Sequence, residues 1–259
     1  KRRAIYAAYA FCRHCDDIGD EEGTPSEKKA RLELTRRHLA QRGGGPSQDP
    51  IFAALDDAAR AFSIPTDYFE QVVDGVEMDL TWTRFQTFDE LRAYCYKVAS
   101  VVGLICVEVF GYSDPNAREY AIDLGIAMQL TNIQRDVKED ADRGRIYIPV
   151  QEMESFGYSE RDLLDGVSDS RFRDLMRFQS ERARRYFDSG RRLIPLVDAD
   201  SRACPSVLHG VYSAILSRIE SSGFNVFDER IGLSKGQKLL LAARLWAGSL
   251  IPAVSLRRR

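Results

Sequence analysis

Five of the seven residues 16–22 are aspartate or glutamate. On a helix, Asp16 and Asp20 share one face, and Tyr9 and Arg13 continue that face toward the N-terminus. Like charges one turn apart repel each other unless a divalent cation lies between them. Oxygen ligands without histidine or thiolate suit Mg²⁺, with Mn²⁺ as the alternative. The competing interpretation is a solvent-exposed acidic helix end, which the helix dipole disfavours.

A second polar group follows an apolar run in the middle of the chain. Asn132, Asp136 and Asp140 are spaced by four and form one stripe, with Gln129 just above them and Arg135 beside them. Polar groups on a largely buried helix are costly when they lack partners, so this stripe requires some. A surface helix with ordinary ion pairs explains the interleaved charges of this segment, but it does not explain the two amides.

Together, the two groups predict one chemistry. Two facing acidic helices hold Mg²⁺ ions, the ions bind a diphosphate, and arginines neutralise the remaining charge. Metal ions and arginines make diphosphate a better leaving group. The 11 tyrosines and 13 phenylalanines are enough to line a cavity that shelters a carbocation from water, although core packing is their default use.

The elements that must position these residues are helices. Apolar residues recur at intervals of three and four, and no segment shows the alternation of a strand. A glycine-rich loop is expected over residues 43–46, and residues 144–169 are expected to form a long connection with short helical pieces. We predict one all-α domain over residues 1–259, with helices over residues 4–18, 52–62, 68–80, 88–111, 117–139, 174–196, 208–222 and 234–249.

Composition excludes several classes of protein. With 37 basic and 39 acidic residues, the net charge of −2 gives no reason to expect nucleic-acid binding. The five cysteines include no second pair or histidine cluster to complete a zinc site, so we expect reduced thiols in a cytoplasmic protein. No uninterrupted apolar run reaches the ~18–20 residues of a membrane span. No histidine is paired with a carboxylate at ligand spacing, which disfavours a di-iron bundle.

The two polar groups also carry a resemblance to a known family. Residues 9–21 resemble the first aspartate-rich motif of the squalene/phytoene synthases, and residues 123–149 resemble the second. Residues 94–103 resemble the motif between them, and the segment around Tyr212 is similar to a later family helix. The resemblance implies a class I isoprenoid synthase fold, with helices around a central cavity. It also implies Mg²⁺-dependent, head-to-head condensation of two prenyl diphosphates through a cyclopropylcarbinyl diphosphate.

The resemblance further implies roles for individual residues. Ala99 and Gly103 are small where a prenyl chain must pass, although close helix packing explains them equally well. Tyr94 matches a tyrosine that steadies cationic intermediates, and it joins Arg13 and Arg135 as a catalytic candidate. The metal ligands implied are Asp16, Asp20, Asn132, Asp136 and Asp140, and the diphosphate contacts implied are Tyr9, Arg13, Gln129, Arg135 and Tyr212.

The choice of substrate rests on weaker signals. Residues 99–103 and 107–110 look more like the bacterial presqualene diphosphate synthases, so we expect two farnesyl diphosphates to give a C30 product. The alternative is a phytoene synthase that condenses two geranylgeranyl diphosphates. A head-to-tail prenyl elongase or terpene cyclase fits the second motif poorly. A non-catalytic helical binding protein is the remote alternative, because the metal-binding residues are intact.

Three expectations concern partners and the chain ends. No dinucleotide fingerprint is present, which argues weakly against NADPH use. Peripheral membrane contact is plausible because substrate and product are greasy, and the basic residues 257–259 suit an anionic surface. The chain opens with Lys1 in a helical pattern and without a methionine, so we expect the family's short N-terminal substrate segment to lie upstream. The sequence does not predict the oligomeric state.

Overall fold

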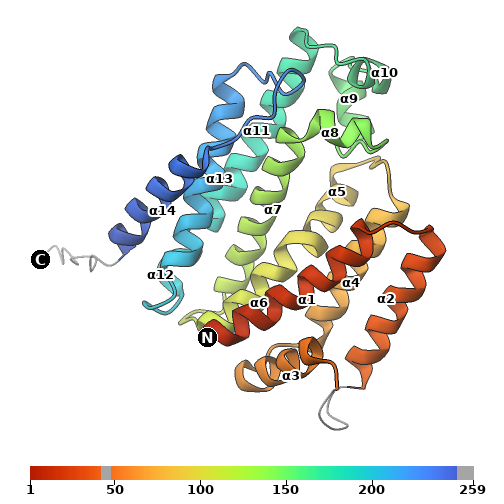
Figure 1. The fold of residues 1–259 in the computed structure, drawn as a ribbon. Coiled ribbons are helices and arrows are strands. Elements are labelled where there is room, and N and C mark those ends of the chain that lie inside the picture. Colours follow the sequence, from red (N-terminus) through yellow and green to blue (C-terminus); the bar gives the residue numbers. More distant parts are fainter. Residues whose placement is uncertain (42–47, 250–259) are drawn as a thin grey trace, which may run out of the picture.

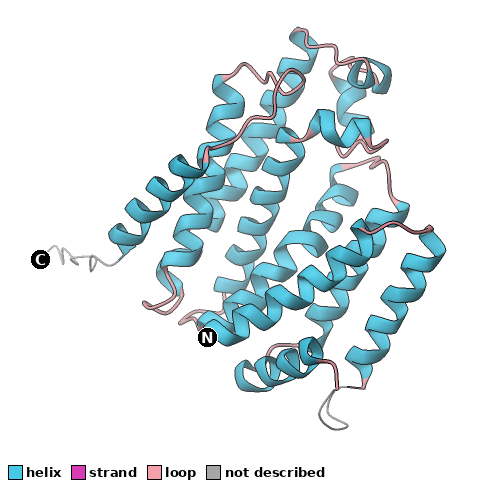
Figure 2. Ribbon diagram, viewed as in Figure 1, coloured by secondary structure: helices cyan, strands magenta, loops and turns pink. Residues whose placement is uncertain are grey.

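Helices dominate residues 1–41 and 48–249, which are the residues that the computed structural model describes, and the only β contacts among them are two isolated bridges (Figure 2). The all-α prediction is confirmed. In chain order the elements are α1 (Arg2–Asp20), α2 (Pro25–Ala40), α3 (Pro50–Phe62), α4 (Thr66–Thr81), α5 (Phe88–Cys95), the π-helical turn η1 (Tyr96–Ser100), α6 (Val101–Phe110), α7 (Ala117–Arg135), α8 (Val137–Asp142), α9 (Val150–Ser155), α10 (Glu160–Leu164), α11 (Ser170–Gly190), α12 (Leu193–Leu196), α13 (Ala203–Ser221) and α14 (Lys235–Ser249).

Two of the predicted helices are interrupted in the structure, a third contains the π-helical turn η1, and α13 begins at Ala203 rather than at residue 208. The predicted helix over residues 117–139 is interrupted at Asp136, whose backbone leaves the helical region, although the bonds from Asp136 N to Asn132 O (2.9 Å) and from Asp140 N to Asp136 O (2.8 Å) carry the stripe across the break. The predicted helix over residues 174–196 is divided into α11 and α12. The predicted loop over residues 43–46 lies outside the described residues.

Helix α2 was missed by the sequence analysis. Only Leu32, Thr35 and Leu39 of this charged helix are buried, so its apolar spacing is too sparse to reveal it. Its start carries a clear signal, because Thr24 and Glu27 form a capping box in which each side chain accepts from the other's backbone N–H. The capping box was therefore the available signal, rather than the periodicity.

Helix α6 lies between two clusters of buried side chains. Its residues Val101, Ile105 and Val109 pack with α1, α3 and α4, whereas Leu104 and Val107 pack with α7 and the helices that follow it (Figure 1). Burial on two sides explains why this helix is apolar all round. The continuous helix Phe88–Phe110 is consequently long and apolar enough to cross a membrane by length and composition alone, which the search for uninterrupted runs did not indicate.

The π-helical turn η1 lies against α7 almost backbone to backbone. A Cβ atom on Gly125 would lie 2.5 Å from Ser100 Cα and 2.7 Å from Ser100 N. The Ser100 hydroxyl donates to the Ile122 carbonyl at 2.7 Å, which fixes the same crossing. Single π-helical turns inside α-helices often occur at functional sites. Here, the crossing sets where α6 runs along α7, and therefore where the space between them opens.

We expect Gly125→Ala to destabilise the fold. The new methyl group meets backbone atoms that cannot rotate away, so the free energy of unfolding should fall by about 2–3 kcal/mol, as in other overpacked sites. Chemical denaturation measures the change. Gly236→Ala is the matched control, because a Cβ there meets nothing within 4 Å and alanine favours helix, so that variant should be neutral or slightly more stable. Equal stability of the two variants would contradict the close crossing.

Candidate active site

The first acidic group lies at the end of α1, on the face opposite the core. Tyr9, Arg13, Asp16 and Asp20 are all exposed, as their spacing predicts, while the other face of the helix is buried. Neighbouring side chains displace part of the water around the Asp16 carboxyl. This desolvation, together with the charge of Asp20, raises the pKa of Asp16 to about 6. Such crowding of carboxylates is costly without a cation, and it fits a site that binds one.

Asp136 holds the centre of the second acidic group. Arg135 Nε donates to Asp136 Oδ1 at 2.8 Å and its Nη2 donates to Oδ2, while Arg230 Nε reaches Oδ1 from the loop before α14 at 2.8 Å. Burial works the other way, but these bonds hold the pKa of Asp136 below its usual range. Arg230 was not singled out by the sequence analysis, because 94 residues separate it from its partner.

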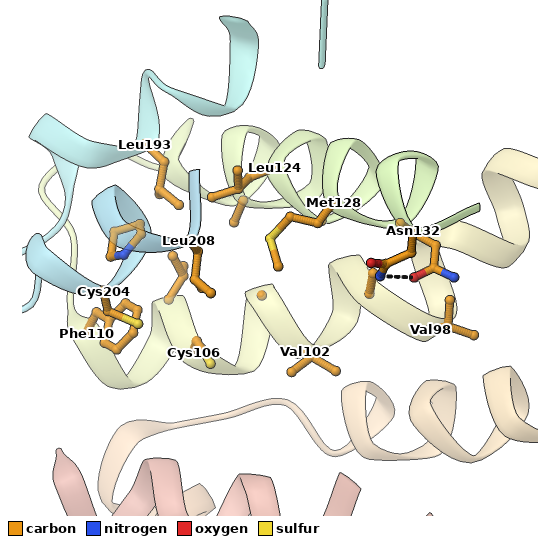
Figure 3. A pocket seen from close by; sticks show the side chains of 17 residues that line it. Val98, Val102, Cys106, Phe110, Leu124, Met128, Asn132, Leu193, Cys204 and Leu208 are labelled. Carbon is orange, nitrogen blue, oxygen red and sulfur yellow. Dashed lines mark hydrogen bonds between the residues drawn. The ribbon is translucent and has the colours of Figure 1, made fainter. Parts of the chain in front are cut away.

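Asn132 supplies the clearest sign of a missing ligand. Its Nδ2 donates to Gln129 Oε1 at 3.3 Å, one turn earlier on α7 (Figure 3). Its Oδ1 is buried and has no hydrogen-bond partner. A buried oxygen without a partner is costly, and an amide oxygen beside carboxylates is a good ligand for a hard divalent cation. The residues present therefore fit the metal that the sequence predicts.

Asp140 extends this site by one turn. Burial and the nearby charge of Asp136 raise the pKa of Asp140 to about 7, so the second group resembles the first in crowding negative charge. Within residues 1–41 and 48–249, no three histidine, cysteine or acidic side chains lie close enough to hold a metal ion by themselves. A metal site here therefore needs the amide of Asn132, a ligand of the substrate, or movement of the acidic side chains.

If this site binds the divalent cation that its residues fit, the affinity for that cation should depend on pH. A carboxyl with a higher pKa in the folded than in the unfolded chain binds more protons when folded, so its contribution to stability is lost as pH rises from about 4 to about 7. Asp140 and Asp16 both behave this way, whereas Asp136 titrates below this interval. Because Mg²⁺ competes with these protons, it should raise the Tm several degrees more at about pH 8 than at about pH 5. Thermal unfolding with and without Mg²⁺ measures this, and a larger Mg²⁺ effect at about pH 5 would contradict it.

Tyr94 is buried, and its hydroxyl is bound to a carboxylate that the sequence analysis did not select. It donates to Asp79 Oδ1 at 2.8 Å, and Tyr147 donates to the same oxygen at 3.1 Å. The two rings are stacked, with centroids 5.3 Å apart. Burial raises the pKa of Asp79, and the charge of Asp20 adds to the effect. No local signal in the sequence marks Asp79, because the same helix also carries Asp74 and Glu77.

An apolar cavity of about 280 Å³ begins beside Asn132 and runs between α6 and α7 toward α12 and α13 (Figure 3). The wall from Val98 to Phe110 follows roughly 18 Å of helix axis. Ala99 and Gly103 line it, as the resemblance implies, but a Cβ on Gly103 would also meet the Ala121 carbonyl at 3.3 Å, so helix packing needs this glycine as well. The other lining residues are Val102, Cys106, Val107, Ala121, Leu124, Gly125, Met128, Gln129, Asn132, Leu193, Cys204, Pro205 and Leu208.

The remaining predicted contacts are less closely assembled. Arg13 pairs with Asp17 at 2.7 Å rather than with Asp16 or Asp20. Tyr212 on α13 is partly buried against the core, and neither it nor Tyr9 lines the cavity. The structure therefore joins Gln129 and Asn132 to the cavity, whereas it shows no contact of Arg13, Tyr9 or Tyr212 with the cavity or with the second acidic group among the described residues.

Comparison with known proteins identifies the family. The sequence profile of the squalene/phytoene synthase family matches residues 1–237. The chain belongs to this family. It is 40% identical over 258 residues to the 15-cis-phytoene synthase of Synechocystis, which covers 95% of this chain and 77% of that protein. It is also 40% identical over 255 residues to the phytoene synthase of Mycobacterium tuberculosis, covering 96% of this chain and 83% of that protein.

Solved structures agree with this assignment. A dehydrosqualene synthase aligns with a TM-score of 0.85 and 28% identity, over 96% of this chain and 88% of that one. A squalene synthase from Alicyclobacillus acidocaldarius aligns with a TM-score of 0.82 and 29% identity, over 86% of this chain and 84% of that one. The isoprenoid synthase fold is thus confirmed. The protein is a prenyltransferase, and its family joins two prenyl diphosphates head to head with a divalent metal.

The expected preference for farnesyl diphosphate is less well supported than its alternative, because the relatives at 40% identity are named phytoene synthases. The structure shows that two of the residues behind this expectation do not bear on chain length. Ser100 is completely buried and bonded to the Ile122 carbonyl, and Val101 packs toward α1 and α4. Neither residue lines the cavity, so their identities do not report the length of the chain that the cavity holds.

Proposed function

We propose that this protein condenses two molecules of geranylgeranyl diphosphate into phytoene. The similarity to phytoene synthases over nearly the whole chain supports this substrate. The shape of the cavity agrees with it, because an apolar channel begins at the polar residues Gln129 and Asn132 and ends at apolar residues of α12 and α13. A prenyl diphosphate has the same division into a charged head and an apolar tail.

Mg²⁺ is the proposed metal, and the partnerless Oδ1 of Asn132 is the observation that carries this proposal. Asp136 and Asp140 would join Asn132 on the side of α7 and α8, and Asp16 and Asp20 would supply ligands from α1. When bound, Mg²⁺ neutralises diphosphate and makes it a better leaving group. A carboxylate and amide ligand set suits this hard cation.

The arginines have a second task in this proposal. Arg135 and Arg230 hold Asp136 in the described structure, and Arg13 holds Asp17. Each guanidinium can also bind phosphate oxygens in a bidentate manner. In this proposal, these side chains share the charge of the diphosphate, and Gln129, Tyr9 and Tyr212 contribute uncharged hydrogen-bonding groups.

The cavity would then control the carbon chemistry. Ionisation of one diphosphate releases diphosphate and leaves an allylic cation, which alkylates the 2,3 double bond of the second molecule; loss of a proton closes the ring and gives a cyclopropylcarbinyl diphosphate. A second ionisation releases the other diphosphate, rearrangement joins the two chains, and loss of a proton from the final cation gives the neutral hydrocarbon without a reductant. Side chains such as Val102, Leu124 and Met128 exclude water along this path, and water would otherwise quench each cation.

Farnesyl diphosphate is the second candidate substrate, since the aligned solved structures are a dehydrosqualene synthase and a squalene synthase. Mass spectrometry of products decides between them. Purified protein with Mg²⁺ receives geranylgeranyl or farnesyl diphosphate, each with and without NADPH. A C40 hydrocarbon made without NADPH is the expected result, and a C30 product formed only from farnesyl diphosphate would overturn the proposed substrate. The cytoplasmic location and peripheral membrane contact stay predictions.

A further inference from the structure

Asp79 occupies a junction that connects three parts of the site. It lies in the last turn of α4, and its Oδ1 accepts the hydroxyl groups of Tyr94 from α5 and Tyr147 from the segment after α8. Its backbone carbonyl accepts from Arg145 Nη2 at 3.0 Å. No arginine or lysine side chain is bonded to its carboxylate among the described residues. The contacts of this carboxylate are therefore two phenols rather than an ion pair.

The same junction fixes the segment that follows the second acidic group. Ile146 N donates to the Thr83 carbonyl at 3.0 Å, and Val150 N donates to the Phe85 carbonyl at 2.9 Å. With the Arg145 bond, these contacts bind the segment to the end of α4. Phe85 also stacks on Tyr147, with centroids 5.7 Å apart. The backbone therefore has several anchors besides Asp79, so the carboxylate itself is not needed to hold the segment in place.

The direction of the two hydroxyl bonds has a chemical consequence. A phenol has one hydrogen to donate and oxygen lone pairs that accept. When the hydrogen is given to a carboxylate, the oxygen becomes a better acceptor, because hydrogen bonds in a chain polarise one another. Tyr94 lies about one turn before Val98, and Val98 lines the polar end of the cavity beside Asn132. The hydroxyl itself is buried and is not part of the cavity wall, but an electron-rich phenol oxygen close to this region is suited to positive charge.

We propose that Asp79 is a positioning residue for the condensation, which orients the hydroxyl groups of Tyr94 and Tyr147 so that their oxygens face developing positive charge as acceptors. This inference rests on the proposed function and adds a residue to it. Without the carboxylate, both hydroxyls are free to rotate and to donate in other directions. The second ionisation, which creates a cation from the cyclopropylcarbinyl intermediate, should then suffer most.

Three variants test this role. Asp79→Ala removes the acceptor of two charge-assisted bonds and should lower kcat by about 100-fold, while KM stays within about threefold. The released cyclopropylcarbinyl diphosphate should rise as a fraction of total product. Asp79→Asn keeps an oxygen that accepts from both hydroxyls, so it should recover most of the activity and the normal product ratio. Glu70→Gln, an exposed acid on the same helix, is the control and should behave as wild type.

A double-mutant cycle separates positioning from a structural role. If Asp79 acts through the hydroxyls, Asp79→Ala should have little further effect on kcat and product ratio in a protein that already carries Tyr94→Phe and Tyr147→Phe. The proposal is overturned if the effects multiply, or if Asp79→Asn is as damaging as Asp79→Ala. It is also overturned if Asp79→Ala abolishes the rise in Tm caused by Mg²⁺ alone, because Asp79 would then act as a metal ligand.

Two features keep this test informative. If Asp79→Ala fails to fold, Asp79→Asn and the double phenylalanine variant still give opposite expected results, with activity in the first and loss in the second. All variants are compared on the diphosphate that the wild type consumes, so a wrong chain length in the proposed function leaves the comparison intact.

Discussion

Asp136→Asn is expected to lower turnover by at least ~10³-fold while the protein remains folded. The substitution removes a charge from the proposed metal site and keeps the shape of the side chain. Asp136 is bonded to Arg135 and Arg230 at a helix junction rather than packed in the apolar core, so the loss of stability should be about 1–2 kcal/mol. Steady-state kinetics with Mg²⁺ and circular dichroism measure the two effects separately.

A matched acid at the other end of α8, which Asp136 precedes, provides the control for this result. Asp142 is exposed, and Asp142→Asn should retain activity within about threefold. Asp16→Asn, in the first acidic group, should reproduce the loss seen with Asp136→Asn. Near wild-type turnover in both Asp136→Asn and Asp16→Asn would show that these acids do not bind an essential metal.

Filling the cavity at Cys106 should select against the longer substrate. The thiol lines the wall between Val102 and Phe110, so a phenylalanine there would occupy space in the deeper half of the cavity (Figure 3). Excluding the terminal carbons of a C20 chain forfeits their burial, at about 0.8 kcal/mol for each CH₂ group. We expect Cys106→Phe to lower kcat/KM for geranylgeranyl diphosphate by about 100-fold and to affect farnesyl diphosphate much less.

The control for this experiment is Cys106→Ala, which keeps the cavity open and should leave the ratio of the two substrates unchanged. Competition between the two diphosphates in one vessel, followed by mass spectrometry, gives that ratio directly. No loss for either substrate would show that the prenyl tail does not extend past Cys106, and an equal loss for both would show that the space beyond Cys106 does not distinguish the two chain lengths.

Spacing alone predicted much of the fold, because most helices bury one face. In α1, the alternation of Phe11, Cys15 and Ile18 with Arg13 and Asp16 places the acids on the outer face, and the structure confirms it. Helix α2 escaped detection because three buried side chains are too few to make a pattern. For α6, the spacing predicted the helix but not which face meets which neighbour, because the helix is buried on two sides and its faces do not differ in polarity.

The candidate site divides in the same way. Asp16, Asp20, Asn132, Asp136 and Asp140 were selected from their own motifs, since neighbouring turns of one helix place them together. Asp79 and Arg230 were not selected, because only their contacts with residues distant in the sequence show that they belong to the site. Arg230 binds an aspartate 94 residues earlier, and Asp79 binds tyrosines 15 and 68 residues later. No local spacing encodes such contacts.

The amino-acid sequence by itself determined the helical class, the family and the two acidic groups, since each of these depends on residues within a few helical turns. The tertiary structure alone decided which side chains meet across helices. In the folded chain, Tyr94 donates to Asp79, Arg230 donates to Asp136, and the Ser100 side chain is bonded to α7 and does not line the cavity. The physical reason is that packing fixes the direction of each side chain only after the helices have docked, and the close approach of Gly125 to Ser100 sets one of those dockings.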